Sequence, residues 1–127
     1  MNPSTESLEK RIGQVSMLGQ AICVAMENEL HKIGFIHPET LIGRFDSVEF
    51  QISRDPSNGE EALKGAWRTA QGRSVGMVIF YADGTFYAEH DVVRPHPTSR
   101  RWFVEAVTAW GRGANVKAEA RLLPALN

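Results

Sequence analysis

Gly76-Met-Val-Ile-Phe-Tyr-Ala-Asp-Gly-Thr-Phe-Tyr-Ala-Glu-His-Asp-Val92 contains two β-rich runs joined at Asp83-Gly84. An Asp-Gly pair between such runs is a strong hairpin signal, because glycine readily adopts the positive φ that tight hairpin turns require. The stretch therefore predicts a protein built around an antiparallel sheet. If Asp83 and Gly84 form a two-residue loop, His90 lies opposite Met77.

Three further segments place apolar or small residues at every second position, which is typical of half-buried strands. They contain Val48, Phe50 and Ile52; Leu63, Gly65, Trp67 and Thr69; and, near the C-terminus, Val116, Ala118, Ala120 and Leu122. The turn-forming sequence Asp55-Pro-Ser-Asn-Gly59 separates the first two. Prolines in Arg94-Pro-His-Pro97 end the run of strands, because proline cannot donate to a ladder. The order predicts a four-stranded antiparallel meander and a separate C-terminal strand.

The N-terminal region, from about Ser4 to Ile33, has apolar residues at helical spacing. Such a helix would be about 45 Å long, which is longer than a small sheet usually covers. Gly13 and Gly19 would each cost about 1 kcal/mol in its interior relative to alanine. We therefore expect either a break or bend near one of these glycines, or an overhang that packs against a second subunit.

A second helix is predicted from Thr98 or Ser99 to about Trp110. Its buried stripe would consist of Phe103, Ala106, Val107 and Trp110, and Gly111-Arg-Gly113 would end it. The expected fold class is α+β, a single domain of residues 1–127. It comprises a long N-terminal helix, a four-stranded antiparallel meander, a second helix and a C-terminal strand, with both helices on one face of the sheet.

Composition excludes several classes of protein. The chain of 127 residues has a net charge of −1, which provides no overall field to attract nucleic acid or an anionic membrane. One cysteine excludes an internal disulfide framework and a multi-cysteine metal site. No secretory signal or run of about 20 apolar residues is visible. We expect a cytoplasmic protein without a cofactor, a metal, a membrane association or a nucleic-acid partner.

The hairpin suggests a ligand pocket. Phe86, Ala88, His90 and Val92 share one face of the second hairpin strand, and Val75, Met77, Ile79 and Tyr81 would complete that face in the two-residue-loop register. His90, Met77, Tyr81 and Trp67 are therefore the candidate ligand-pocket residues. Two interpretations of His90 remain open. It is either a core histidine bonded to a main-chain carbonyl or a tyrosine hydroxyl, or the polar group of a pocket between sheet and helices.

The opposite hairpin face would carry Phe80, Tyr87 and Glu89, together with Val78 and Asp91. Mixed aromatic and acidic residues are typical of a partner surface, so Phe80, Tyr87 and Glu89 are candidate interaction residues. The alternative is the ordinary solvent face of an amphipathic sheet, on which Phe80 and Tyr87 form a cross-strand aromatic pair.

A third candidate site is the basic segment around Arg94, His96, Arg100 and Arg101. Two arginines in a first helical turn oppose the helix dipole, and together with the helix N-terminus they would bind an anion such as phosphate or carboxylate. The alternative is that these arginines point to water or pair with nearby acidic residues.

The chain has no Walker-type loop, dinucleotide fingerprint or nucleophile elbow, which favours a non-enzymatic protein while leaving an enzyme open. The leading hypothesis is a protein-binding or adaptor module that acts as a homodimer. One alternative is a ligand-binding or enzymatic pocket with His90 as its polar group. Another is anion or nucleic-acid binding through Arg94, Arg100 and Arg101.

Overall fold

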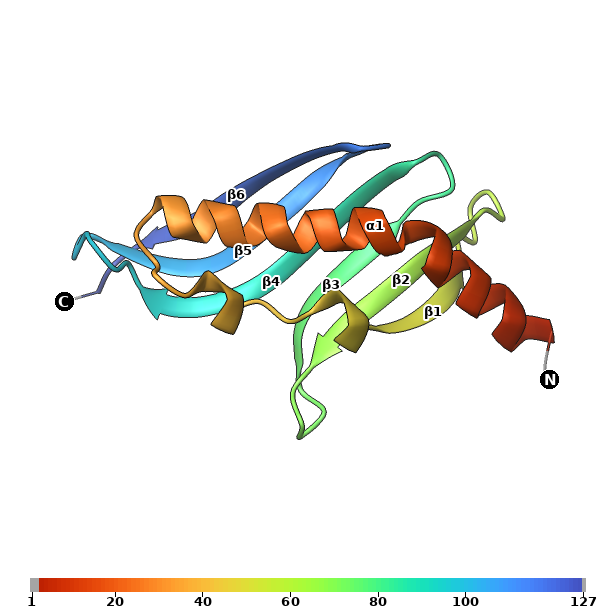
Figure 1. The fold of residues 1–127 in the computed structure, drawn as a ribbon, viewed down its shortest axis with the longest axis horizontal. Helices are drawn as coiled ribbons and strands as arrows, with labels where there is room; N and C mark the ends of the chain where they lie inside the picture. The colour runs from red at the N-terminus through yellow and green to blue at the C-terminus, as the bar shows by residue number, and fades with distance from the viewer. Residues whose placement is uncertain (1–2, 127) are drawn as a thin grey trace.

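The protein folds as one long helix packed on a six-stranded antiparallel sheet (Figure 1). The structure, a computed structural model, describes residues 3–126, with side chains from residue 7 onward. The order is α1 (Pro3–Lys32), the 3-10 turns η1 (Pro38–Thr40) and η2 (Phe45–Ser47), then β1 (Glu49–Arg54), β2 (Glu61–Arg68), β3 (Ser74–Phe80), β4 (Thr85–Pro95), β5 (Trp102–Arg112) and β6 (Asn115–Pro124). Each strand pairs with the next along the chain, so β1 and β6 are the two edges.

The predicted fold class is wrong in its strand count and in its second helix. The sheet has six strands rather than a meander of four with a separate C-terminal strand, and the segment predicted as a helix from 98 to 110 forms β5. A bulge explains the error. Against β6, the register of β5 shifts between Val104 and Ala106, and Glu105 is the extra residue.

The bulge changes the spacing of the core residues of β5. Val104, Val107 and Ala109 all join the core, so the extra residue at Glu105 produces an i, i+3 spacing inside a strand. That spacing imitates a helical stripe. Pairing with β4 on one side and β6 on the other provides β5 with a hydrogen-bonding partner along both edges.

The prediction of α1 is confirmed, and the helix runs without a break for 30 residues. In Figure 1 it lies across one face of the sheet. Its first turns are inclined to the remainder of the helix and extend beyond the side of the sheet where β1 and β2 lie. Gly19 is required by packing, because a Cβ at this position would overlap the ring of Phe45. Gly13 has open space around its Cα.

The hairpin forms, but its register differs from the two-residue-loop expectation. Phe80 pairs with Phe86, and the N–H of Tyr81 donates to the carbonyl of Thr85 at 2.9 Å, so the connection is longer. Gly84 has a φ of 89°, which suits glycine. Gly76, rather than Met77, therefore lies opposite His90.

The core fills the space between α1 and the inner face of the sheet. Its fully buried members include Ile22, Met26 and Leu30 from the helix, and Leu63, Val78, Val104 and Val107 from the strands. We call the face opposite α1 the outer face. Among residues 3–126, no helix is apolar over a long enough stretch to span a bilayer.

Candidate functional site

His90 lies under the segment that connects α1 to β1. Its side chain is 5% exposed, and its Nε2 accepts a hydrogen bond from the main-chain N–H of Gly43 at 3.0 Å. In the neutral ring the proton then lies on Nδ1, which donates to the carbonyl of Asp91 at 2.7 Å. Burial lowers the pKa of His90 and favours this neutral form. Both ring nitrogens are thus engaged with the main chain.

Trp67 completes this arrangement. Its ring centroid lies 5.2 Å from that of His90, and its Nε1 donates to the carbonyl of Arg44 at 2.9 Å. A Cβ at position 43 would overlap the Trp67 ring, so only glycine permits this approach. His90 and Trp67 together anchor residues 43 and 44 onto the sheet.

The four candidate pocket residues do not converge. His90 and Trp67 lie on the inner face, whereas Met77 and Ile79 face outward because of the register shift, and Tyr81 is 47% exposed in the β3–β4 loop. The expectation that Met77 and Tyr81 share a face with His90 is therefore wrong. The cause is the longer β3–β4 loop, because a one-residue shift in pairing moves every side chain of a strand to the other face.

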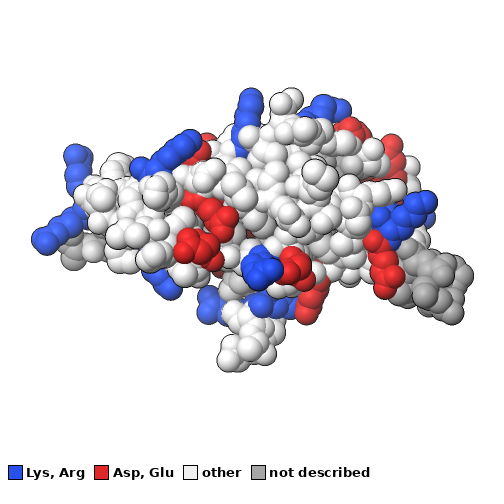
Figure 2. Space-filling model, in the orientation of Figure 1, with Lys and Arg blue, Asp and Glu red and all other residues white. Residues whose placement is uncertain are grey.

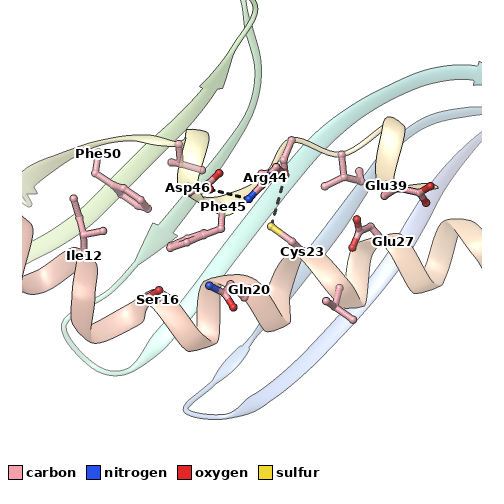
Figure 3. A pocket seen from close by; sticks show the side chains of 14 residues that line it. Ile12, Ser16, Gln20, Cys23, Glu27, Glu39, Arg44, Phe45, Asp46 and Phe50 are labelled. Carbon is pink, nitrogen blue, oxygen red and sulfur yellow. Dashed lines mark hydrogen bonds and ion pairs between the residues drawn. The ribbon is translucent and has the colours of Figure 1, made fainter. Parts of the chain in front are cut away.

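A cleft does lie between α1 and the segment that precedes β1 (Figure 3). It has a volume of about 840 Å³, and its apolar wall includes Ile12, Val24, Ile42, Phe45, Val48 and Phe50. Polar side chains from both elements border it: Ser16, Gln20, Glu27, Glu39, Arg44 and Asp46. This cleft could not be predicted from the sequence, because its two walls are adjacent only in the folded chain.

Burial raises the pKa of two titratable groups of the cleft. Burial, followed by the charge of Glu27, raises the pKa of Cys23 to about 11, so the thiol stays protonated near neutral pH. Its Sγ lies 3.8 Å from the carbonyl oxygen of Gly43. Partial burial and then Glu39 raise the pKa of Glu27, and Arg44 pairs with Asp46 at 3.0 Å. Among the described side chains, those of residues 7–126, no three from His, Cys, Asp or Glu gather closely enough to hold a metal ion.

The three candidate interaction residues occupy different faces of the sheet. Phe80 is 7% exposed and belongs to the core. The expectation that it is exposed beside Tyr87 is wrong, because the one-residue shift in the β3–β4 pairing turns it to the inner face. Tyr87 and Glu89 do share the outer face, where the Tyr87 hydroxyl donates to Glu89 at 3.0 Å. Arg121 pairs with Glu89 at 3.3 Å and lies 3.8 Å from Glu105.

An apolar row crosses the middle of the outer face. Ile79, Tyr87 and Trp110 are direct cross-strand neighbours on β3, β4 and β5. Lys64 pairs with Ile79 from β2, and Lys117 pairs with Trp110 from β6, so a lysine lies at each end of the row. All three central side chains are half-buried by their neighbours on the sheet.

The basic segment predicted to bind anions lies in and beside the β4–β5 loop, at one end of the molecule (Figure 2). It does not begin a helix, so no helix N-terminus adds to an anion site. Arg94, Arg100 and Arg101 are exposed, and none forms an ion pair with a residue in the described range. His96 instead orders the loop, as its Nδ1 accepts from the N–H groups of Thr98 and Ser99.

Comparison with protein-family models, curated proteins and solved structures found no significant match to this chain. The candidate surfaces are therefore defined by their own geometry: the cleft beside α1, the outer face, the basic loop and the free edge of β6.

Proposed function

We propose that this chain is a non-enzymatic binding module of the cytoplasm that acts as a homodimer, with two copies joined along β6. The observation that carries the proposal is a pair of complementary charges on an edge strand. Lys117 and Glu119 are exposed, and among the side chains of residues 7–126 neither forms an ion pair. The other charge of this strand, Arg121, is already paired with Glu89.

The free edge of β6 can accept another strand. β6 is ten residues long, and its partner β5 occupies one side only. Unpaired edges of this length are templates for pairing with a second chain. The other edge strand, β1, has six residues and therefore offers a shorter ladder.

The β5–β6 turn determines which groups face the free edge. Arg112 pairs with Asn115 across Gly113 and Ala114, and Gly113 has a φ of 60°. In a two-residue hairpin the closing pair exchanges hydrogen bonds, and hydrogen-bonded pairs then alternate. Lys117 and Glu119 therefore direct their main-chain groups toward β5, and Ala118 directs its groups outward.

Two copies of β6 match when they pair antiparallel about Ala118. Ala118 then pairs with its own counterpart, and Lys117 of each copy lies opposite Glu119 of the other. A shift of the twofold axis to Glu119 would place Lys117 opposite Arg121, and a shift to Lys117 would place two lysines together. Opposite charges at cross-strand positions contribute about 0.2–1 kcal/mol each, and like charges are destabilising.

The proposed dimer has a continuous sheet whose outer faces adjoin. The Ile79–Tyr87–Trp110 row of each copy would lie on one extended surface, which suits a protein partner better than either row alone. The anchoring of residues 43 and 44 by His90 and Trp67 supports a structural role for the deepest polar side chains, and so a binding protein rather than an enzyme.

Charge reversal tests the dimer by native mass spectrometry and light scattering. Lys117→Glu or Glu119→Lys should weaken association by roughly tenfold, because two cross-strand pairs change from attraction to repulsion. An equimolar mixture of these two variants should form a heterodimer, and the double variant Lys117→Glu/Glu119→Lys should dimerise again. Lys64→Glu, on the same face but away from the edge, is the matched control.

A wild-type chain that stays monomeric at high concentration would overturn the proposal. So would single charge reversals that dimerise as well as the wild type. Ala118→Pro provides a second measurement, because it removes an N–H that points to the free edge and should abolish the dimer while β5 keeps its partners.

A further inference from the structure

A hollow lies at the end of the sheet where the β4–β5 loop meets the last residues of β6. Pro95, Phe103 and Leu123 are cross-strand neighbours that form one row across β4, β5 and β6. The hollow has a volume of about 620 Å³, which is within the range of small-molecule pockets. Its remaining lining includes His96, Ser99, Arg100, Trp102, Pro124 and Leu126.

Apolar side chains at this hollow are unusually exposed. Trp102 is 38% exposed, Leu123 is 42% exposed and Leu126 is 99% exposed. Large apolar groups that gather around a concave site and remain in contact with water commonly mark a binding surface. An apolar ligand would remove this area from water, which favours binding.

The polar groups that line the hollow are hydrogen-bond donors. Nδ1 of His96 accepts from the N–H groups of Thr98 at 3.1 Å and Ser99 at 3.0 Å, so in the neutral ring Nε2 carries the proton. Ser99 provides a hydroxyl and Arg100 provides a guanidinium, and none of the described residues that line the hollow has a carboxylate side chain. Its chemistry thus complements an acceptor with a negative charge.

The charged side chains next to the hollow are also positive. Arg94 and Arg101 flank the lining residues in sequence, and neither forms an ion pair within the described part of the chain. The acidic residue of β5, Glu105, has Arg121 as its neighbour at 3.8 Å. An anion near this loop would therefore meet a positive potential that is not already neutralised.

The loop is held in place before any ligand binds. The N–H of His96 donates to the carbonyl of Trp102 at 3.2 Å, and the N–H of Trp102 donates to the carbonyl of Ser99 at 3.3 Å. The N–H of Ala125 donates to the carbonyl of Arg101 at 2.9 Å, which ties the end of the chain to β5. Such a site loses less conformational entropy on binding than a disordered loop would.

We propose that this hollow binds a small anionic amphiphile, with its apolar body against Trp102, Phe103 and Leu123 and its carboxylate or phosphate at Arg100. The concave shape and the single lining cation favour one molecule per site over a flat membrane surface. The site lies beyond the stretch of β6 used in the proposed dimer, so either proposal can fail without the other.

The test is calorimetric titration of the whole protein with decanoate, kept below its micelle concentration. Decanol, which is uncharged, and decyltrimethylammonium, which is cationic, have an apolar chain of nearly the same length. Decanoate should bind with one molecule per chain, and decanol and the cation should bind at least about tenfold more weakly, because they lack the charge-assisted contact. Decyl phosphate, titrated in the same way, compares the two anionic groups.

Arg100→Gln should weaken the binding of decanoate at least about tenfold and leave the binding of decanol unchanged. Arg73→Gln removes an equal charge from the exposed β2–β3 turn and should leave decanoate binding unchanged. Leu123→Asn should weaken the binding of both decanoate and decanol. Circular dichroism of each variant checks that it is folded.

Three results would overturn the inference. Equal binding of decanol and decanoate would show an apolar surface without anion recognition. Binding to anionic phospholipid vesicles without saturable binding of free decanoate or decyl phosphate would show a membrane-docking surface instead. If the Arg100→Gln variant is folded and binds decanoate as tightly as the wild type, the anionic group binds elsewhere.

Discussion

The imidazole Nε2 of His90 accepts a hydrogen bond of 3.0 Å from the main-chain N–H of Gly43, which joins the middle of β4 to the segment between η1 and η2. Forty-seven positions separate the two residues in sequence. This contact, together with the Trp67 indole on the carbonyl of Arg44, holds one wall of the cleft beside α1.

Removal of the imidazole should destabilise the protein. His90→Ala leaves the N–H of Gly43 and the carbonyl of Asp91 without their partner, and a buried group left unsatisfied costs about 1–3 kcal/mol. Urea unfolding monitored by circular dichroism measures the loss. His37→Ala, at an exposed histidine, is the control and should change the unfolding free energy by less than about 0.5 kcal/mol. Equal effects of the two substitutions would contradict the structural role of His90.

The same histidine should make stability depend on pH in mildly acidic solution. Burial lowers its pKa in the folded state, so the unfolded chain binds the proton more readily. This contribution is fully present above the unfolded pKa of about 6.5 and is lost as the pH falls below it. The wild type should therefore lose more stability than His90→Ala between neutral and mildly acidic pH. Parallel profiles of the two proteins would exclude this assignment.

Two glycines of α1 should respond in opposite directions to the same substitution. A Cβ at Gly19 would overlap the Phe45 ring, so Gly19→Ala should cost about 1–3 kcal/mol despite the higher helix propensity of alanine. Gly13 has nothing within 4 Å of such a Cβ, and Gly13→Ala should stabilise the protein by up to about 1 kcal/mol. Thermal unfolding of the pair is the measurement. A stabilising Gly19→Ala would show that Phe45 can move away.

Cys23 should be unreactive in the native protein. The residue is 8% exposed, and burial raises the pKa of its thiol to about 11, so little thiolate exists near neutral pH. Alkylation by iodoacetamide, followed by mass spectrometry, should be slow in buffer and fast in urea. Rapid modification of the folded chain would mean that the cleft opens at Cys23 without global unfolding.

Val93 should be a point of backbone strain. It has a φ of 51°, which is unfavourable for a β-branched side chain, and its side chain is 52% exposed. Val93→Gly should stabilise the protein by roughly 0.5–1 kcal/mol, because relief of strain exceeds the added entropy of the unfolded chain. Val116→Gly, in a strand without positive φ, should destabilise it. The midpoints of urea unfolding distinguish these outcomes. If Val93→Gly destabilises the protein, the backbone at position 93 is not strained.

Periodicity within single segments determined much of the fold. Residues 3–32 are a helix, the alternating segments around Phe50, Trp67 and Ala118 are strands, and the Asp83-Gly84 stretch is a hairpin, close to where the sequence alone places them. These features depend on which residues follow one another along a short stretch. Local spacing therefore suffices to predict them.

Tertiary pairing decided the features that determine the candidate sites. Segment 102–112 has residues spaced for either a helix or a bulged strand, and only the flanking partners β4 and β6 select the strand. The longer β3–β4 loop shifts pairing by one residue, which buries Phe80 and turns Met77 outward.

The same limit applies to function. The alternation of Lys117 and Glu119 is visible in the sequence. That neither has an ion-pair partner among the described side chains depends on which strands are neighbours. The hollow beside Trp102 likewise needs three strands and a loop to meet. The sequence by itself determined where helix and strands form, because that information is local. Register, partners and cavities were decided only by the tertiary structure, because they depend on contacts between distant segments.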